Sequence, residues 1–438
     1  MALRTLGFAA IYGAGIVLAL FNPVYGVLTY FFEWHNHPPY FWWGSQLPDL
    51  RWSFLIAIVT LGSLVFNRQK LPKLSKMDLK PAIWLILIVL NAYFVSILLA
   101  VNPQKSIDKS IEWTKIVVNF FVMIFIIRSY KDYRMLIWVI LLCVANWGFI
   151  SFEVGSNRDI GVIAPNATEE NAIAAHVVAI LPFFGVYFLQ GKKWEKLFII
   201  LAVPFCLNLM ILANSRGAFL ALLVISAAVI FLTKGKTRFI VIAVLILGAI
   251  GFLHLTNEQF WKRQDSTLTH VQENRPEIRY FIWAGAIKMF KDHPFGVGGG
   301  GFEDLSMQYI PETDIRRSQH NTYLAFLTDW GFFGLIIYLV FLAHTFRITF
   351  QVKKLAKRLP EFQKFSLEAT AIQLALIAIS VAGLTHSRQY AEVVYWLSAF
   401  AIMLKNILIT EIDQMNQMQV EEQESPELTQ AGPMHSPA

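Results

Sequence analysis

The chain has 438 residues and a formal net charge of +7, and 56% of its residues are hydrophobic, 14% aromatic and only 15% charged. With a mean hydropathy of +0.50, this composition excludes an ordinary soluble globular protein and indicates a polytopic membrane protein. Both cysteines, Cys143 and Cys206, lie in apolar segments, which excludes a disulfide framework and a thiolate metal site.

Apolar segments long enough to cross a bilayer recur along the whole chain. Since a membrane-spanning helix needs roughly 17 to 25 mainly apolar residues, we expect an all-α membrane helix bundle with about 12 transmembrane helices. The first segment runs too far past Arg4 for a signal peptide, so it is read as a retained helix. The predicted spans are 5–29, 52–67, 82–101, 112–128, 134–152, 172–190, 197–213, 217–233, 239–256, 321–345, 366–384 and 390–409.

The lysines and arginines between these spans predict the orientation of the bundle. Alternate loops, beginning with the one after the second span, contain 20 basic residues, whereas the opposite short loops contain 6. Cytoplasmic loops carry the excess of Lys and Arg, so the first set of loops is predicted to be cytoplasmic. With 12 spans, both termini are then expected on the cytoplasmic face.

One long segment, 257–320, separates the predicted spans and is placed on the external face by this topology. It divides the chain into residues 1–256 with nine predicted helices, the external loop, and residues 321–410 with three more. The tail, 411–438, is acidic and poor in apolar residues, so it is predicted to be a disordered cytoplasmic end without a catalytic role.

Within the external loop, Pro276 and the sequence Asp292-His293-Pro294 are typical of the start and stop of a helix of roughly 17 residues. Arg279, Trp283, Ala286 and Phe290 would share one face of it. Such a face suits either a membrane surface, with the guanidinium among headgroups, or packing against the bundle. The glycine-rich segment that follows, FGVGGGGF, suggests a flexible turn that folds the loop back, with phosphate contact as the alternative.

Basic residues and a histidine gather at the external ends of the predicted helices. Arg216 is confined to a short turn between two spans, and Arg388 and His386 occupy the last outer turn. Each residue by itself could be an ordinary interfacial side chain, but their location on one face favours an anionic ligand. His320 begins a span behind two arginines, where the helix dipole and the neighbouring charge favour a neutral imidazole that can act as a base.

Four segments, in this order, resemble the O-antigen ligase and polymerase superfamily of bacterial envelope proteins. They are PNATEENAIAAHVVAILPF, NSRGAFLAL, RYFIWAGAIKMFKDHPFGVGGGGF and SQHNTYLAFLTDWGFFGL, and together they cover roughly residues 160–345. The family more often has glutamate where Asp329 stands, so Asp329 is left outside the expected catalytic set. The aromatic segment FNPVYGVLTYFFEWHNHPPYFWWG also resembles ligases associated with exosortase systems, for which the acceptor is a protein.

The resemblance implies a glycosyltransferase of the bacterial inner membrane, with its active site on the periplasmic face. It would move a glycan from an undecaprenyl-pyrophosphate donor to a hydroxyl of lipid A-core or of a protein serine or threonine, among membrane lipids. No metal, nucleotide or other cofactor and no nucleic acid is expected. By motif position, Arg216 and Arg279 would bind the pyrophosphate and His320 would assist catalysis; Arg317 and Arg388 are further expected substrate-binding residues.

Two other functions fit the same features of the sequence. A polymerase that joins carrier-linked repeat units would share these motifs. A lipid-linked glycan flippase or solute transporter would also have many spans and an external basic patch, but transporters usually place ionisable groups near the middle of the membrane. Most of the predicted span centres here lack such groups, which favours chemistry at the surface.

Overall fold

The computed structural model describes residues 3–155, 158–233, 235–256, 258, 260–262, 278–357 and 359–424. These residues form α-helices, short 3-10 turns and connecting loops, without a β-strand in the described ranges, which confirms the all-α prediction. The helices are α1 Leu3–Phe21, α2 Pro23–His35, α3 Trp52–Asn67, α4 Ala82–Leu98, α5 Pro103–Ile126, α6 Tyr130–Val154, α7 Glu170–Gln190, α8 Lys193–Ala213, α9 Arg216–Leu232, α10 Gly235–Leu255, α12 Ile278–Asp292, α13 Gly301–Tyr309, α14 Thr322–Ala356, α15 Gln363–Ala382 and α16 Glu392–Glu424.

In the described ranges, seven helices are long and apolar enough to cross a membrane. Three shorter apolar helices, Ala82–Leu98, Arg216–Leu232 and Arg238–His254, lie beside them in sequence, and the total of about 12 spans stays a prediction. The long helices are α1, α6, α7, α8, α14, α16 and the segment Pro360–Ala382, which includes α15.

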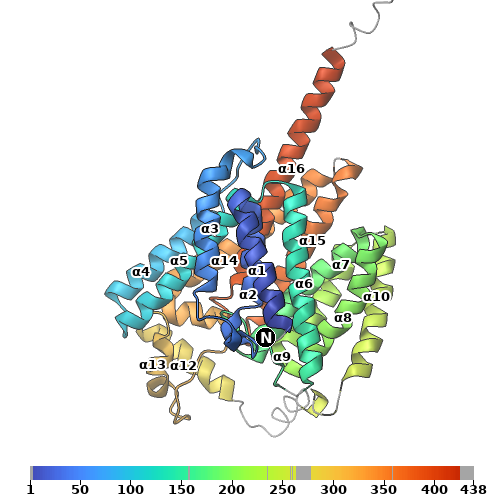
Figure 1. The fold of residues 1–438 in the computed structure, drawn as a ribbon. Helices are drawn as coiled ribbons and strands as arrows, with labels where there is room; N and C mark the ends of the chain where they lie inside the picture. The colour runs from blue at the N-terminus through green and yellow to red at the C-terminus, as the bar shows by residue number, and fades with distance from the viewer. Residues whose placement is uncertain are drawn as a thin grey trace, which may run out of the picture.

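The bundle has two chemically different ends (Figure 1). We call the end that carries α12 and α13 the loop end; it is formed by residues 36–51, 158–169, 214–215, 278–321 and 383–391. The opposite end carries the connections 68–81, 127–129, 191–192 and 359–362, and we call it the basic end because lysines and arginines recur in and beside these connections.

The N-terminal segment corrects the predicted topology. The segment expected as one span, 5–29, is two antiparallel helices, because the Asn22 side chain caps α2 by accepting a hydrogen bond from the Val24 N–H (3.0 Å) and Pro23 occupies its first turn. The Phe8 and Phe32 rings then lie 5.7 Å apart across the hairpin.

As a consequence, α1 begins at the loop end, where Arg4 forms an ion pair with Glu153 in the last turn of α6. The C-terminal half of α16 lies at the basic end, where Lys364 bonds Glu411 at 3.1 Å. In the described residues, α1 therefore begins at the loop end and α16 continues past the basic end (Figure 1), whereas the sequence predicts both termini on one face. The predicted disordered tail also differs, because α16 continues as a helix to Glu424; residues 425–438 lie outside the described residues.

Helix α12 begins at Ile278, and the predicted start at Pro276 lies outside the described residues. Its buried side chains include Ile282, Ala286 and Met289, which pack with residues of α13. Trp283 donates a hydrogen bond from its indole N–H to the Gln319 carbonyl oxygen (3.2 Å). Of the two alternatives for this helix, the structure therefore supports packing against the bundle.

The glycine-rich segment is bound to a kink in α14 rather than free. At Gly331 the backbone of α14 leaves helical geometry (φ 71°), and a Cβ there would lie 2.4 Å from the Phe295 carbonyl carbon, so only glycine fits. The N–H groups of Gly298 and Gly299 donate to the Asp329 carbonyl oxygen (2.9 Å) and the Ser106 hydroxyl (2.8 Å), and the Gly300 N–H donates to the Asp329 carboxylate (3.2 Å). The segment does fold the loop back, but these N–H groups are occupied, so it is neither flexible nor available to a phosphate.

Candidate active site

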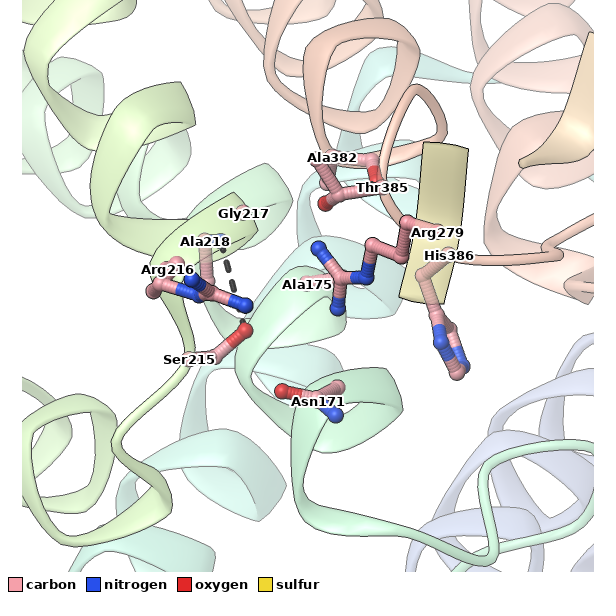
Figure 2. Close-up of a pocket in the computed structure, with 10 residues that line it drawn as sticks. All are labelled: Asn171, Ala175, Ser215, Arg216, Gly217, Ala218, Arg279, Ala382, Thr385 and His386. Atoms are coloured by element: carbon pink, nitrogen blue, oxygen red, sulfur yellow. Dashed lines mark hydrogen bonds between the residues drawn. The ribbon is translucent and has the colours of Figure 1, made fainter. Parts of the chain in front are cut away.

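Arg216 and Arg279 line the same pocket at the loop end, although they come from different helices (Figure 2). Arg216 is the first residue of α9, and Arg279 lies in the first turn of α12. The other lining residues are Asn171, Ala175, Ser215, Gly217, Ala218, Ala382, Thr385 and His386. Among the described residues, the lining therefore contains two guanidiniums and no carboxylate, a composition that suits an anionic ligand.

The local sequence explains how Arg216 comes to face the pocket. Asn214 adopts the left-handed conformation (φ 50°) that ends α8, and the Ser215 hydroxyl accepts a hydrogen bond from the Ala218 N–H (3.4 Å), which starts α9 at once. A Cβ at Gly217 would lie 1.9 Å from the Thr385 hydroxyl oxygen, so glycine allows α9 to approach the α15–α16 loop. The sequence Ser-Arg-Gly thus turns the chain, presents the guanidinium and permits the close contact.

His320 lies beside this pocket, although it does not line it. Its ring centroid is 6.2 Å from that of His386, and its Nε2 lies 3.4 Å from the Ser318 hydroxyl. Burial lowers the pKa of His320 below its ordinary value of 6.5, and the positive charges of His386 and Arg279 lower it further. The imidazole is therefore neutral at neutral pH and able to accept a proton.

A carboxylate–histidine pair adjoins the same site. The Glu169 carboxylate lies 3.1 Å from His386 Nε2, and the hydrogen bond from His386 lowers the pKa of Glu169 against the opposing effect of burial. His320 and Arg388 lower it as well. Glu169 directly precedes α7, which also supplies Asn171 to the pocket. The sequence pattern places His386 in the last outer turn without a role of its own, and it does not single out Glu169 or Asn171. Both lie in the segment TEEN, within the motif before the sixth predicted span.

Arg388 is buried and lies behind the pocket. Its guanidinium donates to the Asn166 carbonyl oxygen (3.1 Å), and its backbone N–H donates to the Thr322 hydroxyl (2.9 Å). Burial lowers its pKa to about 10, so the guanidinium remains charged at neutral pH. Arg388 thereby connects the last outer loop to the loop before α7 and to the start of α14.

Arg317 points back into its own loop. Its Nε donates to the Thr313 hydroxyl (3.3 Å), and its backbone N–H donates to the Ser306 hydroxyl (3.0 Å). Of the five residues that the sequence predicts for the site, Arg216 and Arg279 thus meet at the pocket and His320 adjoins it. Arg388 and Arg317 lie outside the lining.

The Asp329 carboxylate, buried in α14, binds the segments that carry the site. It accepts hydrogen bonds from the Gln319 side chain (3.0 Å) and the Gln389 side chain (3.1 Å), which flank His320 and Arg388 in sequence. It also holds the glycine-rich segment described above. Asp329 therefore links three parts of the loop end: the segment before α14, the glycine-rich segment and the loop before α16. These hydrogen bonds occupy both oxygens of its carboxylate.

Within the described residues, no cluster of three or more His, Cys, Asp or Glu side chains could hold a metal ion.

A family model described as O-antigen ligase, Wzy_C, matches residues 201–339 of the chain. The match includes Arg216, Arg279 and His320, and lies inside the segment whose motifs show the resemblance. A comparison with curated proteins found no match.

Proposed function

We propose, from the match of residues 201–339 to a family model described as O-antigen ligase, that the protein transfers a glycan from undecaprenyl pyrophosphate to an acceptor hydroxyl. The acceptor is a hydroxyl of lipid A-core or of a protein serine or threonine. The proposal places the enzyme in the bacterial inner membrane with the loop end facing the periplasm. The observation that carries it is the meeting of Arg216 and Arg279 at one pocket, beside the neutral imidazole of His320.

In the proposed reaction, the acceptor oxygen forms a bond to the anomeric carbon of the glycan while the bond from that carbon to the pyrophosphate oxygen breaks. The hydroxyl proton passes to a ring nitrogen of His320. The electron pair of the broken bond remains on the departing undecaprenyl pyrophosphate. Arg216 and Arg279 stabilise this growing negative charge, which is where fixed cations contribute most to the rate.

The pocket has the chemistry of a pyrophosphate site but not the volume of a whole substrate site. Its volume of ≈10 Å³ is about that of one water molecule. The two guanidiniums would therefore bind the phosphate groups, while the glycan and the lipid lie outside the pocket. Glu169 supports this arrangement, because its carboxylate orients the His386 ring that forms the wall between the pocket and His320.

The test is a transfer assay in membranes that contain the cell's own undecaprenyl-linked glycan. The variants Arg279→Ala and His320→Ala should each lower the transfer rate by at least about 100-fold, since fixed charges and general bases of this kind contribute roughly that much. Arg316→Ala is the matched control, because Arg316 is 63% exposed on the same loop and bonds Asp304 at 3.1 Å; its rate should be unchanged.

The product of this assay identifies the reaction class. Glycan on lipid A-core or on protein supports the proposed ligase. Longer carrier-linked chains that depend on Arg279 and His320 would instead identify a polymerase. Full transfer by both variants, at matched protein levels, would sink the proposed mechanism.

A further inference from the structure

A second cavity, of ≈530 Å³, opens in the loop between α2 and α3. Its lining includes Tyr40, Phe41, Trp42 and Trp52, three prolines, Ser45 and Asp49. The volume is in the range of cavities that bind small organic ligands, which are mostly apolar with a few well-placed polar groups. Part of the lining lies in the aromatic N-terminal segment noted in the sequence, and none of the predicted site residues belongs to it.

This loop lies at the same end of the bundle as the arginine pocket. The Thr5 hydroxyl in the first turn of α1 donates to the Trp43 carbonyl oxygen (3.2 Å), and the Trp147 indole N–H near the end of α6 donates to the His35 carbonyl oxygen (2.7 Å). The first contact joins the loop to the start of α1, and the second joins the last residue of α2, just before the loop, to α6.

The cavity is built by a tightly folded backbone. Two 3-10 turns, Pro38–Tyr40 and Gly44–Gln46, pack so closely that a Cβ at Gly44 would lie 1.8 Å from the Pro38 carbonyl oxygen. Phe41 and Trp43 are buried and anchor the loop, whereas Trp42 is 66% exposed. The backbone that carries the exposed Trp42 ring is thus anchored by the buried side chains on either side, so little backbone ordering is needed when a ligand binds.

The side chains of the cavity favour a neutral polyhydroxyl ligand. In the described parts of the chain, Trp42 contacts no other aromatic ring, and no hydrogen bond or ion pair engages the Asp49 carboxylate. A ring face attracts the C–H groups of a sugar through its negative quadrupole, and a carboxylate accepts hydrogen bonds from hydroxyls.

The lining of this cavity differs in charge from the lining of the arginine pocket. Among the described residues that line it, Asp49 is the only charged one, and the nearby Arg51 is not part of the lining. A single negative charge disfavours phosphate and anionic headgroups. An aromatic belt at a membrane interface would also expose Trp42, but it would require neither a cavity nor a carboxylate.

We propose that the cavity lined by Tyr40, Trp42 and Asp49 is a carbohydrate subsite that binds sugar residues of the glycan. The inference rests on the proposed function, because it takes the glycan as the substrate. In this arrangement the arginine pocket binds the pyrophosphate and the aromatic cavity binds the neutral sugars. The leaving group and the glycan are then bound at two different places on the protein.

The test measures binding of the glycan without its carrier. The probe is the glycan released by mild acid from the carrier-linked pool of the same cells, titrated by isothermal calorimetry into the full-length protein in zwitterionic nanodiscs. Trp42→Ala and Asp49→Asn should each raise Kd by about tenfold, which corresponds to the loss of one good contact. Trp194→Ala is the matched control, because Trp194 is 62% exposed at the start of α8, at the opposite end; its Kd should match that of the unaltered protein.

Absence of binding by the released glycan, or equal Kd values for Trp42→Ala and Trp194→Ala, would overturn the subsite. Anionic lipid vesicles that bind through Trp42 and displace the glycan would also contradict the proposed carbohydrate subsite. Thermal unfolding at the same temperature for all variants shows that the fold is intact. Arg279→Ala separates the two proposals, because it should abolish transfer and leave glycan binding unchanged. If the unaltered protein transfers no glycan but binds it through Trp42, the proposed function fails and the subsite stands.

Discussion

At the scale of single residues, the loop end uses charge and burial to give chemically similar side chains different roles. Arg216 and Arg279 face a common pocket, whereas Arg388 is buried and donates to a backbone carbonyl oxygen. His320 and His386 differ in the same way, because a carboxylate holds the ring of His386 while burial keeps His320 neutral. The residue type alone therefore does not decide the role.

The lowered pKa of His320 predicts the acid limb of the pH–rate profile. The group must be neutral to accept a proton, so transfer should be maintained as pH falls to 6.5, the ordinary value, and should decline only below it. The measurement is the transfer rate against pH at saturating donor.

His320→Gln is the control for this profile, because a glutamine side chain does not titrate. The residual transfer rate of this variant should not show the decline below pH 6.5. Glu169 titrates in a lower range, because its pKa lies below its ordinary value of 4.5. A limb centred above pH 7, or the same limb in His320→Gln, would contradict the assignment of His320 as the base.

At the scale of elements, the α1–α2 hairpin decides the topology. One more helix than the sequence predicts reverses the side on which the chain begins. The apolar segment of α1 and α2 continues through Asn22 and Pro23, and hydropathy therefore joins the two helices. The break between the two helices is marked by the cap at Asn22 and by the proline in the first turn of α2. A search for apolar segments does not take such local features into account.

Cysteine accessibility checks this topology. Leu3→Cys should react with a membrane-impermeant maleimide added outside intact spheroplasts, and Met418→Cys should react only after permeabilisation. Both side chains are exposed, at 86% and 57%, while the native Cys143 and Cys206 are buried and provide an unreactive background. Protection of both new cysteines until permeabilisation would show that the two ends share the cytoplasmic face after all.

At the scale of the whole molecule, the sequence predicts which residues belong to the loop end better than it predicts their contacts. Arg216 and His320 are recognisable because each lies at the boundary of an apolar segment, and Arg279 because it lies on one face of the loop helix. The pair of Glu169 and His386, by contrast, joins two loops that are distant in sequence, and only the packing of α7 against α15 brings them together. The role of the glycine-rich segment was also inaccessible, because its acceptors lie on α14 and α5.

The whole molecule thus combines an apolar bundle with one end that concentrates polar chemistry. Asp329 links the segments of that end by hydrogen bonds, and we propose that the arginine pocket binds phosphate and the aromatic cavity binds sugars. The central claim is that Arg216 and Arg279 bind the pyrophosphate of the donor.

The most direct test is equilibrium binding of undecaprenyl pyrophosphate to the purified protein in nanodiscs. Arg216→Ala and Arg279→Ala should each weaken binding by roughly 10- to 100-fold, because a hydrogen bond to a charged group is worth about 1.5–3 kcal/mol and each 1.4 kcal/mol is tenfold. Arg316→Ala should bind as the unaltered protein does. Unchanged affinity in both pocket variants would contradict the account, whatever the transfer assay shows.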